Sequence, residues 1–155
     1  MSVVEINYNP LQAGVTQISP ARNLLLHGAL MTITVSPIPK PTMQQASMTP
    51  PATGLALIDT GATYTCIDET TCQALGIQAV GTATVNHVDG ASIRACYPVQ
   101  VSFPDLKLPP LKIIRATSVK LANHTPPFIA LIGRDLLSRF KLTYNGPRGR
   151  IEIAY

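Results

Sequence analysis

Hydrophobic and polar residues alternate along much of the chain, and this period of two predicts strands rather than long helices. The clearest pair of alternating segments is 80–85 and 91–101. The polar stretch between them, 86–90, ends in Asp-Gly, which is typical of a tight turn. We therefore expect a long hairpin here. The same pattern predicts further strands at 111–116, 142–144 and 150–155, the last two joined by a turn at 145–149.

Two shorter segments, 54–58 and 128–132, are continuously apolar, which is typical of strands that are buried on both faces. A longer apolar stretch, 22–36, is interrupted at His27-Gly28 and becomes β-branched toward its end. This pattern predicts one or two more strands around the interruption.

Short helices are expected at two places that follow these strands. Asp68 is suited to cap the N-terminus of a helix over 69–75, and Gly76 is suited to end it. A second short helix is expected over 134–140.

These elements predict a mostly β protein, a closed barrel-like sheet with one or two short helices. A chain of 155 residues is long enough for one domain with its own core. We expect an N-terminal arm at 1–20 and a single domain over 21–155. Five of the 14 prolines fall within 36–53, which is therefore expected to be a surface loop.

Charge and cysteine content narrow the classes of function. The net charge is +4, but no basic run is interleaved with aromatic residues, so we expect no nucleic-acid partner. None of the three cysteines or three histidines has metal-ligand spacing, so no metal or other cofactor is expected. The most apolar stretch, 24–35, is too short to span a bilayer, and no signal-peptide pattern begins the chain. We expect reduced thiols, no membrane partner and a cytoplasmic location.

One acidic residue stands out, because Asp59 ends the apolar run 54–58 and is followed by Thr60 and Gly61. Two interpretations are open: the carboxylate caps a turn, or it is the reactive group of a site. The motifs of α/β-hydrolases, P-loop enzymes, dinucleotide-binding folds and zinc proteases are absent from the sequence. A carboxylate at the floor of a cleft is therefore the best candidate for chemistry.

The surroundings of Asp59 favour the second interpretation. The segment Leu-Ala-Leu-Ile-Asp-Thr-Gly-Ala-Thr is followed some 70 residues later by Phe-Ile-Ala-Leu-Ile-Gly-Arg-Asp-Leu-Leu. This pair closely resembles the two signatures of retropepsins, the retroviral-type aspartic proteases. The resemblance covers roughly residues 54–155 and implies a retropepsin fold, with the 80–101 hairpin as the flap that closes over a peptide.

The resemblance also implies a role for each matching residue. Asp59 would be the catalytic acid and base, and Thr60 would bond across the dyad. Gly61 would offer its backbone to the substrate, and Ala62 would line the adjacent pocket. Further support would come from Thr63, Ile132, Gly133 and Arg134. The flap would include His87, Val88, Asp89, Gly90 and Ala91.

The chemistry of this family needs two carboxylates, and the chain has one such motif. The resemblance therefore implies a homodimer in which two copies of Asp59 activate a water, without any cofactor, to hydrolyse a protein or peptide substrate. The alternative is a weak or inactive retropepsin-fold module for dimerisation or peptide binding. The C-terminal strand 150–155 would either interleave with the partner subunit or pair within its own hairpin.

Two departures from the viral pattern matter. Retroviral enzymes usually carry an acidic residue where this chain has Thr63, so Arg134 loses its expected partner. We expect Arg134 to bond Asp135, a backbone carbonyl or a neighbouring subunit instead. The flap tip also carries one glycine where retroviral flaps often have several.

Overall fold

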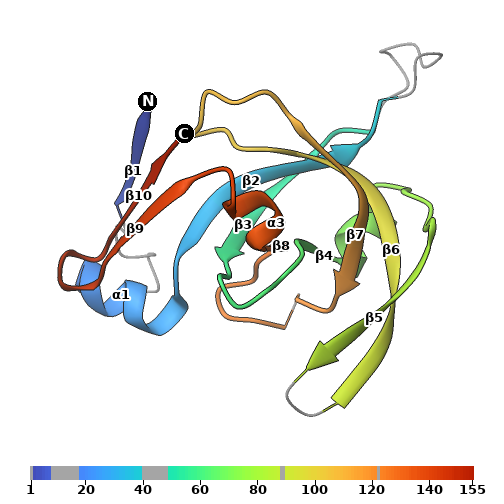
Figure 1. The fold of residues 1–155 in the computed structure, drawn as a ribbon, viewed down its shortest axis with the longest axis horizontal. Coiled ribbons are helices and arrows are strands. Elements are labelled where there is room, and N and C mark those ends of the chain that lie inside the picture. The colour runs from blue at the N-terminus through green and yellow to red at the C-terminus, as the bar shows by residue number, and fades with distance from the viewer. Residues whose placement is uncertain (1, 8–17, 40–48, 88–89, 122) are drawn as a thin grey trace.

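The computed structural model describes residues 2–7, 18–39, 49–87, 90–121 and 123–155, which form strands and a few short helices (Figure 1). The strands are β1 (Val3–Asn7), β2 (Leu30–Pro37), β3 (Ala52–Ile58), β4 (Cys66–Asp68), β5 (Gly81–His87), β6 (Gly90–Ser102), β7 (Leu111–Val119), β8 (Ala130–Ile132), β9 (Lys141–Asn145) and β10 (Arg150–Ala154). The α-helices are α1 (Pro20–His27), α2 (Glu69–Ala74) and α3 (Arg134–Leu137), and a 3-10 turn, η2 (Gly146–Arg148), joins β9 to β10.

The main sheet has the strand order β2-β3-β8-β4-β7-β6-β5. Two of its pairings are parallel, β3 with β8 and β4 with β7, whereas the other pairings are antiparallel. An additional pairing joins β2 to β6, between Thr34–Pro37 and Val99–Ser102. The predicted mostly β character with short helices is confirmed.

Apolar side chains from both ends of the chain fill the core. The strands of the main sheet supply Ile33, Val35, Val99 and Val101, none of which is exposed. Leu24 of α1 joins the same cluster, and β10 contributes through alternating residues. This alternation on β10 follows from a sheet that packs one face and leaves the other to solvent.

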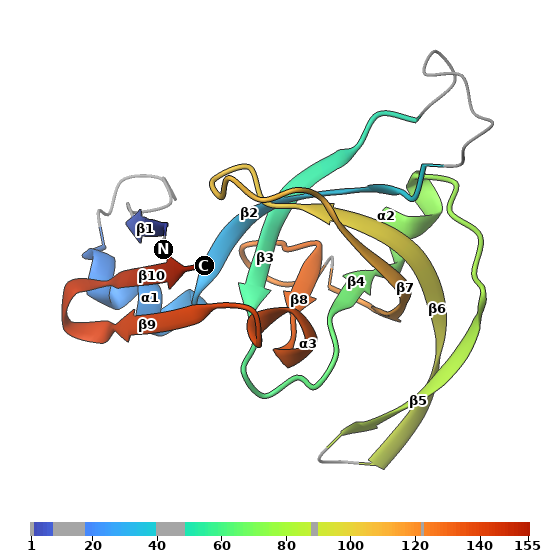
Figure 2. The same ribbon diagram turned by 45° about the horizontal axis from the view of Figure 1, so that its top comes forward.

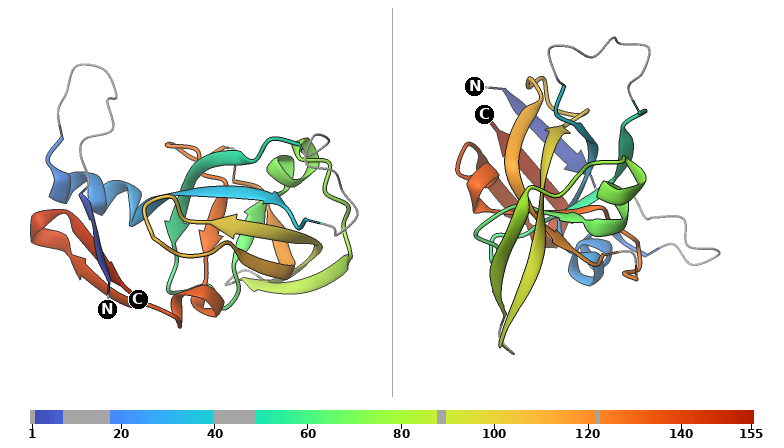
Figure 3. Two further views of the ribbon diagram at one scale, coloured as in Figure 1. Left: turned by 90° about the horizontal axis from the view of Figure 1, so that it is seen from above. Right: turned by 90° about the vertical axis from the view of Figure 1, so that its right-hand side faces the viewer.

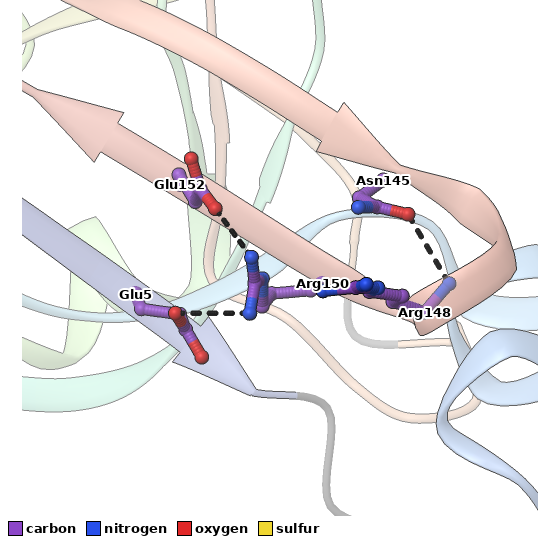
Figure 4. A network of polar contacts seen from close by, with 5 residues as sticks. All are labelled: Glu5, Asn145, Arg148, Arg150 and Glu152. Atoms are coloured by element: carbon purple, nitrogen blue, oxygen red, sulfur yellow. Dashed lines mark hydrogen bonds and ion pairs between the residues drawn. The ribbon is translucent and has the colours of Figure 1, made fainter.

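A smaller sheet has the order β1-β10-β9, so the C-terminal strand lies between two strands of its own chain. Of the two predicted arrangements for 150–155, the structure has the intrachain hairpin. Arg150 on β10 pairs with Glu5 on β1 and with Glu152, at 3.2 and 2.7 Å (Figure 4). The Arg150–Glu5 ion pair thus connects β10 to β1 across this sheet.

Most predicted elements lie where the sequence places them. The hairpins formed by β5 with β6 and by β9 with β10 are confirmed, although residues 88–89 of the first turn lie outside the described residues. The second predicted helix ends early at Leu137, because Arg139 and Phe140 donate to carbonyls three residues back in tighter turns.

The prediction of strand structure over the first half of 22–36 was wrong, because α1 occupies 20–27. Ser19 precedes this helix, and its hydroxyl oxygen accepts a hydrogen bond from the backbone N–H of Arg22. Pro20 occupies the first turn, where its missing N–H costs nothing. These N-terminal signals outweigh the apolar run Leu24–Leu26, of which Leu25 and Leu26 remain exposed.

Asp68 connects three parts of the fold, as its predicted capping role suggests. Its carboxylate accepts hydrogen bonds from the backbone N–H groups of Thr71 in α2 and Leu121 after β7, and from the Thr70 hydroxyl. Burial raises the pKa of this carboxyl, but these hydrogen bonds outweigh burial and leave the pKa below its ordinary value.

We expect Asp68→Asn to lower the free energy of unfolding at neutral pH by about 1–3 kcal/mol, because two backbone donors lose a charged acceptor. A lowered folded-state pKa stabilises the fold above the unfolded-state pKa, and the gain disappears as pH falls through the folded pKa. The loss of stability below about pH 4 should therefore be shallower in Asp68→Asn. Urea unfolding across this pH range measures the free energy of unfolding of each protein. Asp105→Asn, at an exposed loop position, is the control. Equal acid sensitivity in wild type and Asp68→Asn would contradict the assignment.

Candidate active site

The loop 59–65 joins β3 to β4, and these two strands lie on either side of β8 (Figure 2). Because β8 is parallel to β3 and antiparallel to β4, the loop passes around the end of β8. The backbone N–H of Asp59 donates to the carbonyl of Ile132, the last residue of β8, at 3.0 Å. The two segments of the sequence signature are thus adjacent in space.

The Asp59 carboxylate is held by its own loop. Its Oδ1 accepts hydrogen bonds from the backbone N–H groups of Gly61 at 2.8 Å and Ala62 at 3.2 Å. The residue is half-buried, and no described residue of this chain donates a hydrogen bond to Oδ2. Asp59 therefore caps the turn with one oxygen and leaves the other available, so the two interpretations of this residue are compatible.

Arg134, the first residue of α3, holds the loop from the other side. Its Nη1 donates to the backbone carbonyls of Thr60 at 2.8 Å and Gly61 at 3.2 Å. Its Nη2 donates to the hydroxyl oxygen of Thr63 at 2.9 Å. The expectation of a backbone carbonyl partner is confirmed. The expectation that Thr63 leaves Arg134 without its usual partner was wrong, because the hydroxyl accepts where a carboxylate would.

Asp135 and Thr65 form a second connection that the sequence did not identify. The backbone N–H and the hydroxyl of Thr65 both donate to Asp135 Oδ1, at 2.9 and 2.7 Å. The Thr65 hydroxyl oxygen in turn accepts from the backbone N–H of Gly133 at 3.1 Å. Thr65 is fully buried, and a hydroxyl at the entry to a buried strand was the signal for this role.

Gly133 lies against the loop where no side chain fits. A Cβ at this position would lie 2.5 Å from the carbonyl carbon of Tyr64 and 2.8 Å from the backbone nitrogen of Thr65. Real Cβ atoms essentially never approach backbone so closely, and the backbone of Gly133 is extended with φ −87°. Glycine is therefore required by the close approach of the loop and not by an unusual backbone conformation.

Cys66 begins β4 and lies near both aspartates of the site. Burial, and then the charges of Asp135 and Asp59, raise the pKa of its thiol to about 11. The three cysteines are free and buried. A thiol that stays protonated is a poor nucleophile, which favours Asp59 over Cys66 as the reactive group of this site.

Of the predicted flap residues, His87, Gly90 and Ala91 lie on the β5–β6 hairpin, which projects beyond the other elements (Figures 1 and 3). Gly90 and Ala91 are exposed at the start of β6. Val88 and Asp89 lie outside the described residues, and His87 is described only through its backbone.

A family model described as Aspartyl protease matches residues 52–136, which is more than half of the chain. The chain belongs to the aspartyl protease family. The matched region runs from β3 through most of α3, so it includes both the Asp59 loop and Arg134. No curated protein matches the chain.

The fold of this aspartyl protease family member is similar to a solved structure, a retropepsin-like aspartic protease from Rickettsia conorii. The TM-score is 0.50 with 16% sequence identity, and the match covers 98% of this chain and 91% of that chain. The fold is thus retropepsin-like.

Two other features of the described residues bear on the site. They contain no group of three or more His, Cys, Asp or Glu side chains arranged to hold a metal ion. None of the helices in the described part of the chain has the length and apolarity needed to cross a membrane.

We expect Gly133→Ala to destabilise the fold by about 1–3 kcal/mol, because the methyl group forces backbone apart. Thermal unfolding measures the loss, and Gly54→Ala is the matched control. The three atoms nearest to a Cβ at Gly54 all belong to the Ile129 side chain, the closest at 3.0 Å, so a shift of one side chain, and not of backbone, would relieve the contact. A loss for Gly133→Ala no larger than that for Gly54→Ala would show that the loop does not need this close approach.

We expect Thr63→Val to lower the free energy of unfolding by about 0.5–1.5 kcal/mol. Valine has nearly the same shape as threonine but lacks the hydroxyl that accepts a hydrogen bond from Arg134. Thr84→Val, at an exposed position of β5, is the control. The cost of Thr63→Val should largely vanish in an Arg134→Lys background, since a lysine lacks the planar fork. Equal costs in both backgrounds would mean that the hydroxyl does not act through Arg134.

Proposed function

We propose that the chain is an aspartic endopeptidase that acts as a homodimer, with Asp59 of each subunit as a catalytic residue. The observation that carries this proposal is the fixed orientation of the Asp59 carboxylate, with Oδ1 bound by Gly61 and Ala62 and Oδ2 available. Membership of the aspartyl protease family and the retropepsin-like fold support it. The pairing of β2 with β6 is consistent with the closed, barrel-like sheet that the sequence predicts.

The proposed reaction uses two carboxylates about 3 Å apart that share one proton. The ionised carboxylate takes a proton from water as the water oxygen attacks the peptide carbonyl carbon, and the other carboxyl donates its proton to the carbonyl oxygen. The carboxyl that took the proton from water then donates it to the peptide nitrogen, while the other carboxylate takes a proton from a hydroxyl of the tetrahedral intermediate. The C–N bond breaks, releasing an amine and a new carboxyl group, and the dyad again holds one proton.

The second carboxylate must come from a second chain, since no other Asp in the sequence is followed by Thr-Gly or Ser-Gly. A two-fold axis would bring two identical 59–63 loops together, and Thr60 is exposed and able to bond across it. In this arrangement Gly61 would offer its backbone to the peptide, and Ala62 would line the adjacent pocket. The β5–β6 hairpin would cover the peptide as a flap.

The absence of an acidic residue at position 63 does not by itself remove this function. Arg134 still holds the carbonyls of Thr60 and Gly61, so the loop keeps its shape with a hydroxyl in place of a carboxylate. If wild type dimerises or binds peptide but cleaves it weakly or not at all, the alternative holds instead: a weak or inactive retropepsin-fold module for dimerisation or peptide binding. The free, buried cysteines are compatible with a reducing compartment such as the cytoplasm.

We expect wild type to cleave an unstructured protein between about pH 4 and 7, and Asp59→Asn to cleave it at least about 100-fold more slowly, because the neutral amide cannot take the proton from water. Mass spectrometry of the fragments measures cleavage, and thermal unfolding confirms that Asp59→Asn is folded. The rate should rise faster than linearly with chain concentration while dimers are a minority. Equal cleavage by both proteins, or none by wild type at any concentration that yields dimers in sedimentation, would contradict the proposal.

A further inference from the structure

Arg134 brings an unneutralised positive charge to the loop of Asp59. Its guanidinium is exposed and its three acceptors are two carbonyl oxygens and one hydroxyl oxygen, all of them neutral. The adjacent carboxylate of Asp135 is bound instead by Thr65 and by the backbone N–H of Leu136. The charge of Arg134 therefore remains available to a bound molecule.

The face of the main sheet toward Asp59 can be traced from the strand register. Thr117 on β7 lies opposite Cys66 on β4 and opposite Cys96 on β6, and directly opposed residues share a face. Cys66 also lies opposite Leu131 on β8, which lies opposite Leu57 on β3, two residues before Asp59. The row that contains Cys66, Thr117 and Cys96 therefore lies on the face of the sheet toward Asp59.

Two more arginines lie on this face. Arg94 is two residues before Cys96 on β6, and alternate residues of a strand share a face. Arg115 on β7 extends across β6, because its Nη1 lies 3.3 Å from the Cβ position of Gly81, the residue opposite Cys96. The missing side chain of Gly81 leaves room for this guanidinium.

These two arginines also have neutral partners. The Nε of Arg94 donates to the hydroxyl oxygen of Ser92 at 3.2 Å, and Nη2 of Arg115 donates to the carbonyl of Thr82 at 2.9 Å. The ion pairs found within the described part of the chain join Arg150 to Glu5 and Glu152, in the smaller sheet. The face of the main sheet on the Asp59 side thus presents Arg94 and Arg115, and α3 adds Arg134 at the Asp59 loop; none of the three forms an ion pair with a carboxylate of the described residues.

We propose that this site selects peptides with acidic side chains on either side of the scissile bond, and that Arg94, Arg115 and Arg134 are its specificity residues. The inference rests on the proposed proteolytic function and adds a substrate class to it. A guanidinium that is already held by neutral acceptors is pre-oriented, so less side-chain entropy is lost when a carboxylate binds. In an extended peptide, acidic residues that flank the scissile bond would face Arg94 and Arg115 on the Asp59 side of the sheet and Arg134 at the Asp59 loop.

An acidic peptide fits this arrangement better than a nucleic acid. The three cations share one side of the molecule with the Asp59 carboxylate, and this negative charge repels a continuous phosphate backbone but tolerates a neutral peptide bond between two acidic flanks. Continuous tracking of a single strand also needs aromatic residues for stacking, and only 5% of the chain is aromatic.

The test uses two peptides with the same apolar scissile pair, one flanked by Glu and Asp and the other by Gln and Asn. At about pH 5.5 the acidic side chains are ionised. At low salt we expect the acidic peptide to have a kcat/KM about tenfold higher, falling toward equality at about 0.5 M salt. Arg94→Gln and Arg115→Gln should each reduce the ratio about two- to fivefold. Arg148→Gln removes the same charge from the β9–β10 turn and should leave the ratio unchanged.

Binding to Asp59→Asn separates this inference from the proposed function. We expect this variant to bind the acidic peptide more tightly than the neutral one and more tightly than a single-stranded DNA of equal charge. Equal kcat/KM values for the two peptides would overturn the acidic preference and leave the protease standing if Asp59→Asn fails to cleave. If wild type cleaves neither peptide, the proteolytic function fails and the binding series alone decides the preference. Tighter binding of the DNA would overturn the assignment to an acidic peptide.

Discussion

The contact between the 59–65 loop and the start of α3 is the constraint on which the site depends. Gly133 lets the two backbones touch, Arg134 binds the loop carbonyls, and Asp135 binds Thr65 at the loop's far end. Each connection joins residues about 70 positions apart, so β8 fixes their relative position only once the main sheet has formed. The orientation of the Asp59 carboxylate is thus a property of the whole fold.

Features that depend on neighbouring residues could be predicted from the sequence. The alternation of apolar and polar residues predicted both hairpins, and the capping residues Asp68 and Gly76 predicted α2. Both kinds of signal are local, because capping and turn formation depend on neighbouring residues. The helix α1 was missed because the prediction gave more weight to the apolar run Leu24–Leu26 than to the helix-start signals of Ser19 and Pro20. The Thr65–Asp135 connection could not be predicted, since it needs the three-dimensional pairing of distant segments. For Arg134 the sequence left three partners open, namely Asp135, a backbone carbonyl or a neighbouring subunit. In the structure Arg134 binds the carbonyls of Thr60 and Gly61 and the hydroxyl of Thr63.

The smaller sheet changes how a dimer of this chain must be described. β10 is hydrogen-bonded to β1 on one side and to β9 on the other, so both of its edges are used within one chain. An interface that exchanged this strand between subunits would first have to break one of these pairings. The proposed dimer would instead leave this sheet within each chain and bring the two 59–63 loops together.

The central claim is that two chains each contribute one Asp59 to a single site. The most direct measurement mixes wild type with Asp59→Asn at constant total chain concentration, allows the subunits to exchange, and follows the rate of peptide cleavage. If both carboxylates are required, the rate falls with the square of the wild-type fraction, to about a quarter in an equal mixture. A linear fall, to about half, would mean that each chain carries a complete site and would contradict the account.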